Sequence, residues 1–245
     1  MFIGNYVYDC QYFGTNTGDC PSWFLENPRN SITSLLKADS IGCYGSEFDV
    51  WLTKDNGLVV SHDGIIQGHK VEESTLKELT GLWLANGECV PSLKELLETA
   101  KRKTSLKLVL ELKAHSKPER EIKAVEEIVS MIKKMGLEPR MIYITFSSHA
   151  LKELIRQAPT STPVYYLKGD LSPQQLKELG SAGPDYHFSE FYRYSDWIES
   201  CHALGLKVNV WTVNKKEDMQ YFWDKVDFIT TDEPLGLLKD IMKVK

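Results

Sequence analysis

Short apolar runs alternate with longer amphipathic segments along most of the chain, and this order constrains the fold more than any other feature. Runs such as LKLVLEL and KVNVWTV are rich in Val and Leu, as is typical of strands buried on both faces. We predict strands at residues 2–8, 44–52, 106–112, 141–145, 163–167, 186–188, 207–213 and 228–231. Helical patterns follow them, at residues 31–39, 92–103, 119–135, 149–157, 172–180, 194–204, 216–223 and 234–244.

Eight strand–helix units in this order predict an α/β protein with a (β/α)8 TIM barrel. A doubly wound open sheet is the alternative, but the chain has no GxGxxG motif or phosphate-binding loop to support it. No linker interrupts the pattern, so we expect residues 1–245 to form a single domain.

Residues 53–90 break the rhythm and predict a small insertion after the second strand. The segment TKDNGLVVSHDG is typical of a hairpin, because Asp55, Asn56 and Gly57 favour a turn and LVVSH favours a strand. A short helix is expected at residues 74–80. In barrels such excursions leave from the carboxyl ends of the strands, where active sites lie.

Composition excludes several classes of protein. Lys and Arg number 29 and Asp and Glu 34, giving a net charge of −5, which argues against a nucleic-acid-binding protein. No apolar run approaches the ~18 residues of a membrane span, and the first residues lack the pattern of a signal peptide, so a cytoplasmic location is expected. The five cysteines show no CxxC spacing, which argues against a zinc site or a disulfide framework. The sequence does not decide whether Cys10 and Cys20 form a disulfide bridge, nor does it determine the oligomeric state.

Two carboxylates near the end of the second strand suggest a metal site. In GSEFDVWLT, Glu47 and Asp49 are two residues apart, so they point to the same side of a strand, while Phe48 and Val50 point to the other. Two carboxylates on one buried face repel each other unless a cation lies between them. A hard cation such as Mg²⁺ or Ca²⁺ would resolve this. The alternative is that one carboxylate faces solvent or pairs with Lys or Arg.

The end of the third strand adds a second pair of charges. In LVLELKAH, Glu111 and Lys113 lie on one side, where they could hold a metal and an anionic substrate oxygen. An internal salt bridge is the alternative.

Further candidates lie close to other strand ends. His62 ends the second hairpin strand and could act as a general acid or base, although an ordinary loop histidine is the alternative. Trp211, late in the seventh strand, could wall a ligand pocket or simply pack. His115 and His187 could line the mouth of the barrel. Asp232 lies at the rim or caps the last helix.

These segments together resemble the glycerophosphodiester phosphodiesterase family. The matching stretches occur in family order over about residues 26–240: ENPRNSITSLLKA, GSEFDVWLTKDNGLVVSHDG, VPSLKELL, LVLELK, KVNVWTVN and FITTDEP. The resemblance implies a barrel that hydrolyses glycerophosphodiesters to an alcohol and glycerol phosphate with a divalent cation. It implies that Glu47, Asp49 and Glu111 bind the metal, that His62 is one of two catalytic histidines, and that Lys113 lies near the phosphate.

The first segment departs from the family pattern. Family members open with a strand that ends in His-Arg-Gly, whereas no histidine precedes His62 here, and Asp9 or Asp19 falls near the vacant position. Three explanations are open: an enzyme that uses a substitute residue, a catalytically impaired protein that binds metal and a phosphorylated ligand, or an N-terminal sequence that is not native. Phospholipase D-like action on a lysolipid or sphingolipid is a further option, which a broad exposed apolar surface around the insertion would favour.

Overall fold

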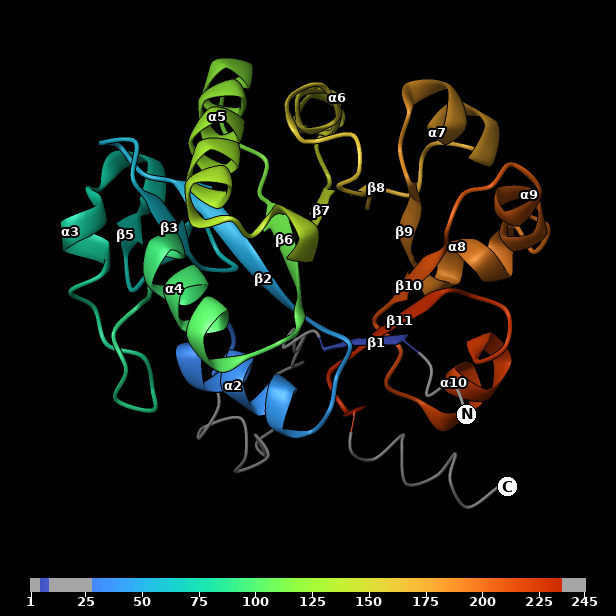
Figure 1. Cartoon of the computed structure of the whole chain (residues 1–245), viewed down its shortest axis with the longest axis horizontal. Helices are drawn as coiled ribbons and strands as arrows, with labels where there is room; N and C mark the ends of the chain where they lie inside the picture. The colour runs from blue at the N-terminus through green and yellow to red at the C-terminus, as the bar shows by residue number, and fades with distance from the viewer. Residues whose placement is uncertain (1–4, 9–27, 235–245) are drawn as a thin grey trace.

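The computed structural model describes residues 5–8 and 28–234, and its central feature is a closed parallel barrel. Strand β1 pairs with both β2 and β11, so the eight parallel strands form a ring rather than an open sheet (Figure 1). In ring order the barrel strands are β1 (Asn5–Tyr8), β2 (Gly45–Leu52), β6 (Lys107–Leu112), β7 (Met141–Thr145), β8 (Val164–Tyr166), β9 (Gly183–His187), β10 (Asn209–Trp211) and β11 (Phe228–Thr231). The predicted (β/α)8 fold is therefore confirmed, and the open-sheet alternative is excluded.

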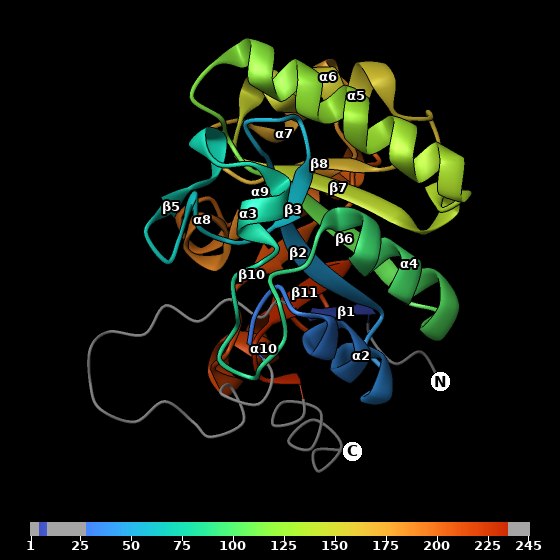
Figure 2. The same ribbon diagram turned by 90° about the vertical axis from the view of Figure 1, so that its left-hand side faces the viewer.

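Helices surround this barrel, as Figures 1 and 2 show. They are α2 (Ile32–Ser40), α4 (Leu93–Lys103), α5 (Pro118–Met135), α6 (Ser148–Gln157), α7 (Pro173–Leu179), α8 (Phe188–Arg193), α9 (Trp197–Ala203) and α10 (Lys216–Phe222), with a 3-10 turn η2 (Glu138–Arg140) before β7. Their starts follow local chemistry: Ser31 and Ser92 cap α2 and α4 through their side chains, as expected of serine at these positions. The helix predicted at 234–244 lies outside the described residues.

The strands bury their two faces in different surroundings. One face packs against the helices in a continuous core that includes Phe48, Val50, Tyr186 and Val210. The other face lines the inside of the barrel, where Val109, Ile142, Ile144, Tyr165, Leu167 and Phe228 pack together. Glu47 and Asp49 alternate with Phe48 and Val50, so the carboxylates are directed to the barrel interior, as the period of a strand requires.

The insertion at 53–90 is built on an extension of β2 beyond the barrel. Strand β3 (Leu58–Val60) pairs antiparallel with the end of β2, and β4 (Ile65–Ile66), β5 (His69–Lys70), η1 (Val71–Glu73) and α3 (Leu76–Leu79) complete it (Figure 2). Asp55 stabilises the predicted turn, because its carboxylate accepts hydrogen bonds from Thr53 Oγ1 (2.6 Å) and from Leu76 N (2.9 Å). The insertion has its own small core and is tied to α2 by Glu88, which accepts from Ile32 N at 3.0 Å.

Two predicted boundaries were wrong. Strand β9 begins at Gly183, three residues before the predicted start, because a glycine there lets the backbone approach the chain before β10 very closely. A Cβ at Gly183 would lie 1.8 Å from the Lys207 carbonyl oxygen. The helix predicted at 194–204 is shorter than predicted, because it is α9, Trp197–Ala203, and a helix that was not predicted, α8, starts directly at the end of β9. Cys10 and Cys20, between which the sequence left a bridge open, lie outside the described residues, in which Cys43, Cys89 and Cys201 are free thiols.

Candidate active site

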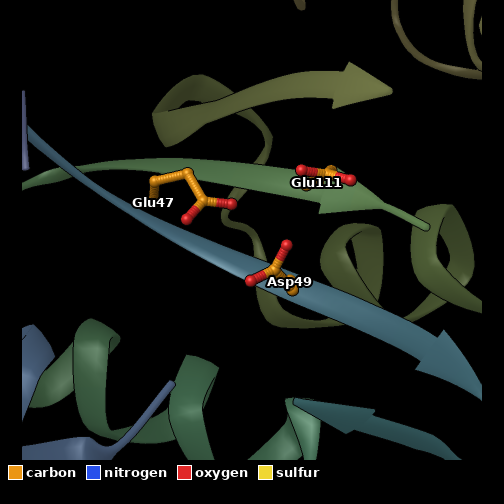
Figure 3. Close-up of side chains that lie close together, drawn as sticks. All are labelled: Glu47, Asp49 and Glu111. Atoms are coloured by element: carbon orange, nitrogen blue, oxygen red, sulfur yellow. The ribbon is translucent and has the colours of Figure 1, made fainter. Parts of the chain in front are cut away.

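Three carboxyl groups meet inside the barrel at the carboxyl ends of β2 and β6. These strands are neighbours, and Asp49 lies in register with Glu111. One carboxylate oxygen from each of Glu47, Asp49 and Glu111 lies within 4.8 Å of the others, and Figure 3 shows the three groups pointing toward one another. The structure thus brings together the three side chains that the sequence singled out as metal ligands, although Glu111 is far from the other two in the chain.

Burial makes this cluster electrostatically demanding. Asp49 is 0% exposed and Glu111 2%. Burial raises the pKa of Glu111 to about 8; the neighbouring Asp49 carboxylate acts in the same direction, while Lys113 opposes the shift. The Lys113 ammonium lies 3.1 Å from Asp49 Oδ1 and 2.9 Å from Glu111 Oε1. Burial acts to lower the pKa of Lys113, but the two carboxylates outweigh burial and raise it. Lys113 is therefore paired with two of the three acidic groups, Asp49 and Glu111.

Asn30 is a part of the site that the sequence analysis did not single out. Its Nδ2 donates to Asp49 Oδ2 at 2.8 Å, and its Oδ1 accepts from the Asp49 backbone N at 2.9 Å. The residue has a φ of 56°, a conformation that asparagine tolerates better than most residues. It directly precedes the Ser31 cap of α2. The only available signal was its place in the stretch ENPRNSITSLLKA, which has no chemical motif of its own.

His62 lies beside this cluster, on the side of the insertion. Its Nδ1 is 2.9 Å from Asp63 Oδ1, and its backbone carbonyl accepts from the Trp51 indole at 3.4 Å. His62 and Asn30 line the same cavity of about 400 Å³, whose walls also include Arg29, Ile66 and Leu84. Asn30, which lines this cavity, is hydrogen-bonded to Asp49, so the cavity adjoins a residue that holds the acidic cluster.

Trp211 lies on the far side of the cluster. It lines a narrow cavity inside the barrel together with Glu47 and Glu111. Its indole N–H donates to the Asp185 carbonyl at 2.8 Å, and its ring meets Phe146 edge-on, with centroids 5.7 Å apart. His187 also lies against Trp211, at 5.2 Å between ring centroids. Trp211 thus lines this cavity and also packs against its neighbours, and its role in binding a ligand stays a prediction.

Two other candidates, His115 and Asp232, form hydrogen bonds that hold the ends of strands in place. His115 Nε2 accepts from the Leu52 backbone N at 2.9 Å, and burial lowers its pKa, so this ring stabilises the end of β2 rather than lining either cavity. Asp232 accepts from Asn214 Nδ2 at 2.7 Å and so joins the ends of β10 and β11. The helix that it was expected to cap lies outside the described residues, as do Asp9 and Asp19.

A parallel (β/α)8 barrel with buried carboxylates at the carboxyl ends of its strands defines a class of enzyme that works at that face of the barrel. Comparison with known proteins narrows the class. The model of the glycerophosphoryl diester phosphodiesterase family matches residues 23–235, and the chain belongs to this family.

Two relatives support the assignment over nearly the whole length. A glycerophosphodiester phosphodiesterase of Caldanaerobacter subterraneus subsp. tengcongensis is 30% identical over 88% of this chain and 93% of its own length. The crystal structure of a glycerophosphodiester phosphodiesterase from Parabacteroides distasonis shows 42% identity and a TM-score of 0.89, with 98% of both chains covered. An Oleispira antarctica phosphodiesterase, solved with its product sn-glycerol-3-phosphate, shares the fold at 23% identity, with a TM-score of 0.75 and with 89% of this chain and 92% of its own covered.

Proposed function

We propose that this protein hydrolyses glycerophosphodiesters to an alcohol and glycerol phosphate with a divalent cation, Mg²⁺ or Ca²⁺, held by Glu47, Asp49 and Glu111. The observation that best supports the proposal is the convergence of three buried carboxyl groups beside a lysine at the catalytic end of the barrel. The substrate is a small molecule, and the acidic composition makes nucleic acid an unsuitable partner.

The residues present fit a hard divalent cation. All three ligand side chains offer oxygen, the donor that Mg²⁺ and Ca²⁺ prefer, and they converge from two strands rather than from a flexible loop. A bound cation would also oppose the effect of burial on Glu111, because positive charge favours the carboxylate form. When bound, it would neutralise phosphoryl oxygens and orient the glycerol hydroxyl.

The surrounding side chains have separate tasks in this proposal. Lys113, held between Asp49 and Glu111, presents positive charge to a phosphate oxygen. Asn30 holds Asp49 by two hydrogen bonds, one that it donates to the carboxylate and one that it accepts from the backbone N, so that the other carboxylate oxygen stays directed to the cluster. His62 is the proton-transfer group at the cavity beneath the insertion, where the alcohol would leave. Trp211 forms a wall of the part of the site that receives the glycerol moiety.

The second histidine of the family pattern has no counterpart before His62. This observation supports a second candidate function, a catalytically impaired barrel that binds a cation and a phosphorylated ligand. The two candidates differ in turnover alone, because both keep the acidic cluster and Lys113.

Lysolipid hydrolysis receives less support. The large apolar side chains exposed on the described part of the insertion are Ile65, 57% exposed, and Trp83, 64% exposed. Two side chains do not make the broad apolar surface that an acyl chain needs.

The deciding experiment measures release of glycerol phosphate from glycerophosphocholine with Mg²⁺ or Ca²⁺, using the native chain and His62→Ala. We expect turnover by the native chain and a loss of about 10²-fold or more in the variant, with metal binding unchanged. No turnover, together with metal-dependent thermal stabilisation by glycerol phosphate, would establish the binding protein instead. Full activity in His62→Ala would remove its catalytic role.

A further inference from the structure

Asp185 is a buried carboxyl group that the proposed chemistry leaves unused. It lies on β9, 2% exposed, and faces the barrel interior, because its neighbour Tyr186 packs in the outer core and donates to Leu171 O. Its Oδ1 is buried and has no hydrogen-bond partner among the described residues. A buried acceptor without a partner costs about 1–3 kcal/mol, so its retention calls for a ligand.

The cavity in front of Asp185 leads directly to the acidic cluster. Its lining includes Glu47, Glu111, Asp185, Trp211 and Thr230. The cavity volume is about 20 Å³, which is room for one small polar group and for little more. The Asp185 backbone carbonyl already accepts a hydrogen bond from the Trp211 indole. The side-chain Oδ1 is therefore the Asp185 acceptor that a ligand can use.

We propose that Asp185 is a specificity-determining residue, whose Oδ1 accepts a hydrogen bond from the terminal hydroxyl of the glycerol moiety. This inference rests on the proposed function. Glycerol esterified at one end has a middle hydroxyl next to the phosphate and a terminal CH₂OH that takes no part in phosphoryl transfer. With the phosphate at Lys113 and the cluster, the terminal CH₂OH is the group of suitable size and polarity for the cavity.

This arrangement has two consequences for substrate choice. A diester of ethylene glycol lacks the terminal CH₂OH and leaves Asp185 unpartnered, so it is a poor substrate, because a site built to bond a hydroxyl rejects the analogue without it. A lysophospholipid acylated at that hydroxyl has no proton to donate, and its chain exceeds a cavity of about 20 Å³. The same residue thus selects glycerol and excludes its acyl esters.

The experiment measures calorimetric dissociation constants, with Ca²⁺ present, for sn-glycerol-3-phosphate and for 2-hydroxyethyl phosphate, which lacks only the terminal CH₂OH. The proteins are the native chain, Asp185→Ala, Asp185→Asn and the control Tyr186→Phe, which removes a hydrogen bond from the outer face of the same strand. Where turnover is found, kcat/KM for glycerophosphocholine and for its 2-hydroxyethyl analogue is compared in the same four proteins.

We expect the native chain and Tyr186→Phe to bind glycerol phosphate at least tenfold more tightly than the analogue. Asp185→Ala should lose that preference while keeping its affinity for 2-hydroxyethyl phosphate, and Asp185→Asn, which retains an acceptor oxygen, should keep part of it. Equal binding of the two phosphates by the native chain, or an unchanged preference in Asp185→Ala, would overturn the inference. Binding of neither phosphate would overturn the proposed function and this inference together, whereas selective binding without turnover would remove only the enzymatic activity.

Discussion

Individual carboxyl groups determine what this barrel can bind. The cluster of Glu47, Asp49 and Glu111 is unfavourable by itself, because burial and mutual repulsion both oppose its charged state. Lys113 offsets part of that repulsion. A divalent cation can offset the rest of the repulsion between the carboxylates, so the stability of the native chain should depend on the metal.

Glu111→Gln is expected to abolish metal-induced stabilisation. At a cation concentration of about 100 times Kd, binding contributes about 2.7 kcal/mol, which corresponds to a rise in Tm of roughly 5–10 °C for a chain of this size. Calorimetric scans with and without Ca²⁺ measure this rise in the native chain, in the variant and in the control Glu178→Gln on the exposed face of α7. An equal rise in all three proteins would show that the cation binds elsewhere.

The ionisation of Asp185 should appear in the pH dependence of folding. Burial raises its pKa to about 7, above the usual 3.8 of an aspartic acid, so the unfolded chain releases this proton at lower pH than the folded chain. The contribution of Asp185 to stability is therefore fully present below about pH 4 and is lost as the pH rises to about 7.

Urea unfolding of the native chain and Asp185→Asn at pH 4.5, 6 and 7.5 tests this sign. The native chain should lose stability relative to the variant by an amount on the order of 1–4 kcal/mol across this range. Asp224→Asn, an exposed control, should show no such trend. A difference between native chain and Asp185→Asn that is the same at pH 4.5 and 7.5 would contradict the assignment.

At the scale of elements, close backbone approach positions the strands that hold the site. Strand β9 carries Asp185, which faces the barrel interior, and His187, which lies at the mouth. This strand begins at Gly183, whose backbone lies against that of Lys207. The start of the insertion is also held by direct contacts, because Arg120 on α5 donates to the Leu52 and Thr53 carbonyls at 2.8 Å each. These contacts fix the walls of the two cavities.

Gly183→Ala is expected to destabilise the protein by about 3 kcal/mol or more, because its Cβ would lie 1.8 Å from the Lys207 carbonyl oxygen. Gly87→Ala is a matched control: its φ of 83° is also positive, but nothing lies within 4 Å of the added Cβ. Its cost should be about 1 kcal/mol, from the backbone conformation alone. Denaturant midpoints measure both, and equal losses would show that the contact with Lys207 is unimportant.

At the scale of the whole molecule, the barrel closes through β1, which pairs with β11 and β2. This closure brings the end of the first strand beside Ser46 and Thr231, next to the acidic cluster. Among the described residues, no helix is long and apolar enough to cross a membrane.

Replacing residues 1–25 with a family-type strand ending in His-Arg-Gly should raise turnover of glycerophosphocholine by about 10²-fold or more, because it restores a second proton-transfer group. The control is the same chimera with that histidine changed to alanine. Equal turnover by the native chain and the chimera would show that another residue already performs this step.

The sequence by itself determined the barrel, its insertion and the side chains of the acidic cluster, because strand period and segment order are local properties. Alternation placed Glu47 and Asp49 on one face, and the family resemblance implied that Glu111 would join them.

Only the tertiary structure decided which side chains share a cavity. Asn30 reaches Asp49 across 19 positions of the chain, and Asp185 faces Glu47 across the inside of the barrel. Neither residue has a local motif, and the Gly-Pro pair at the start of β9 favours a turn when taken alone. Ring closure brings strands distant in the chain onto one interior, so burial, unpaired oxygens and cavity size exist only once the barrel has formed.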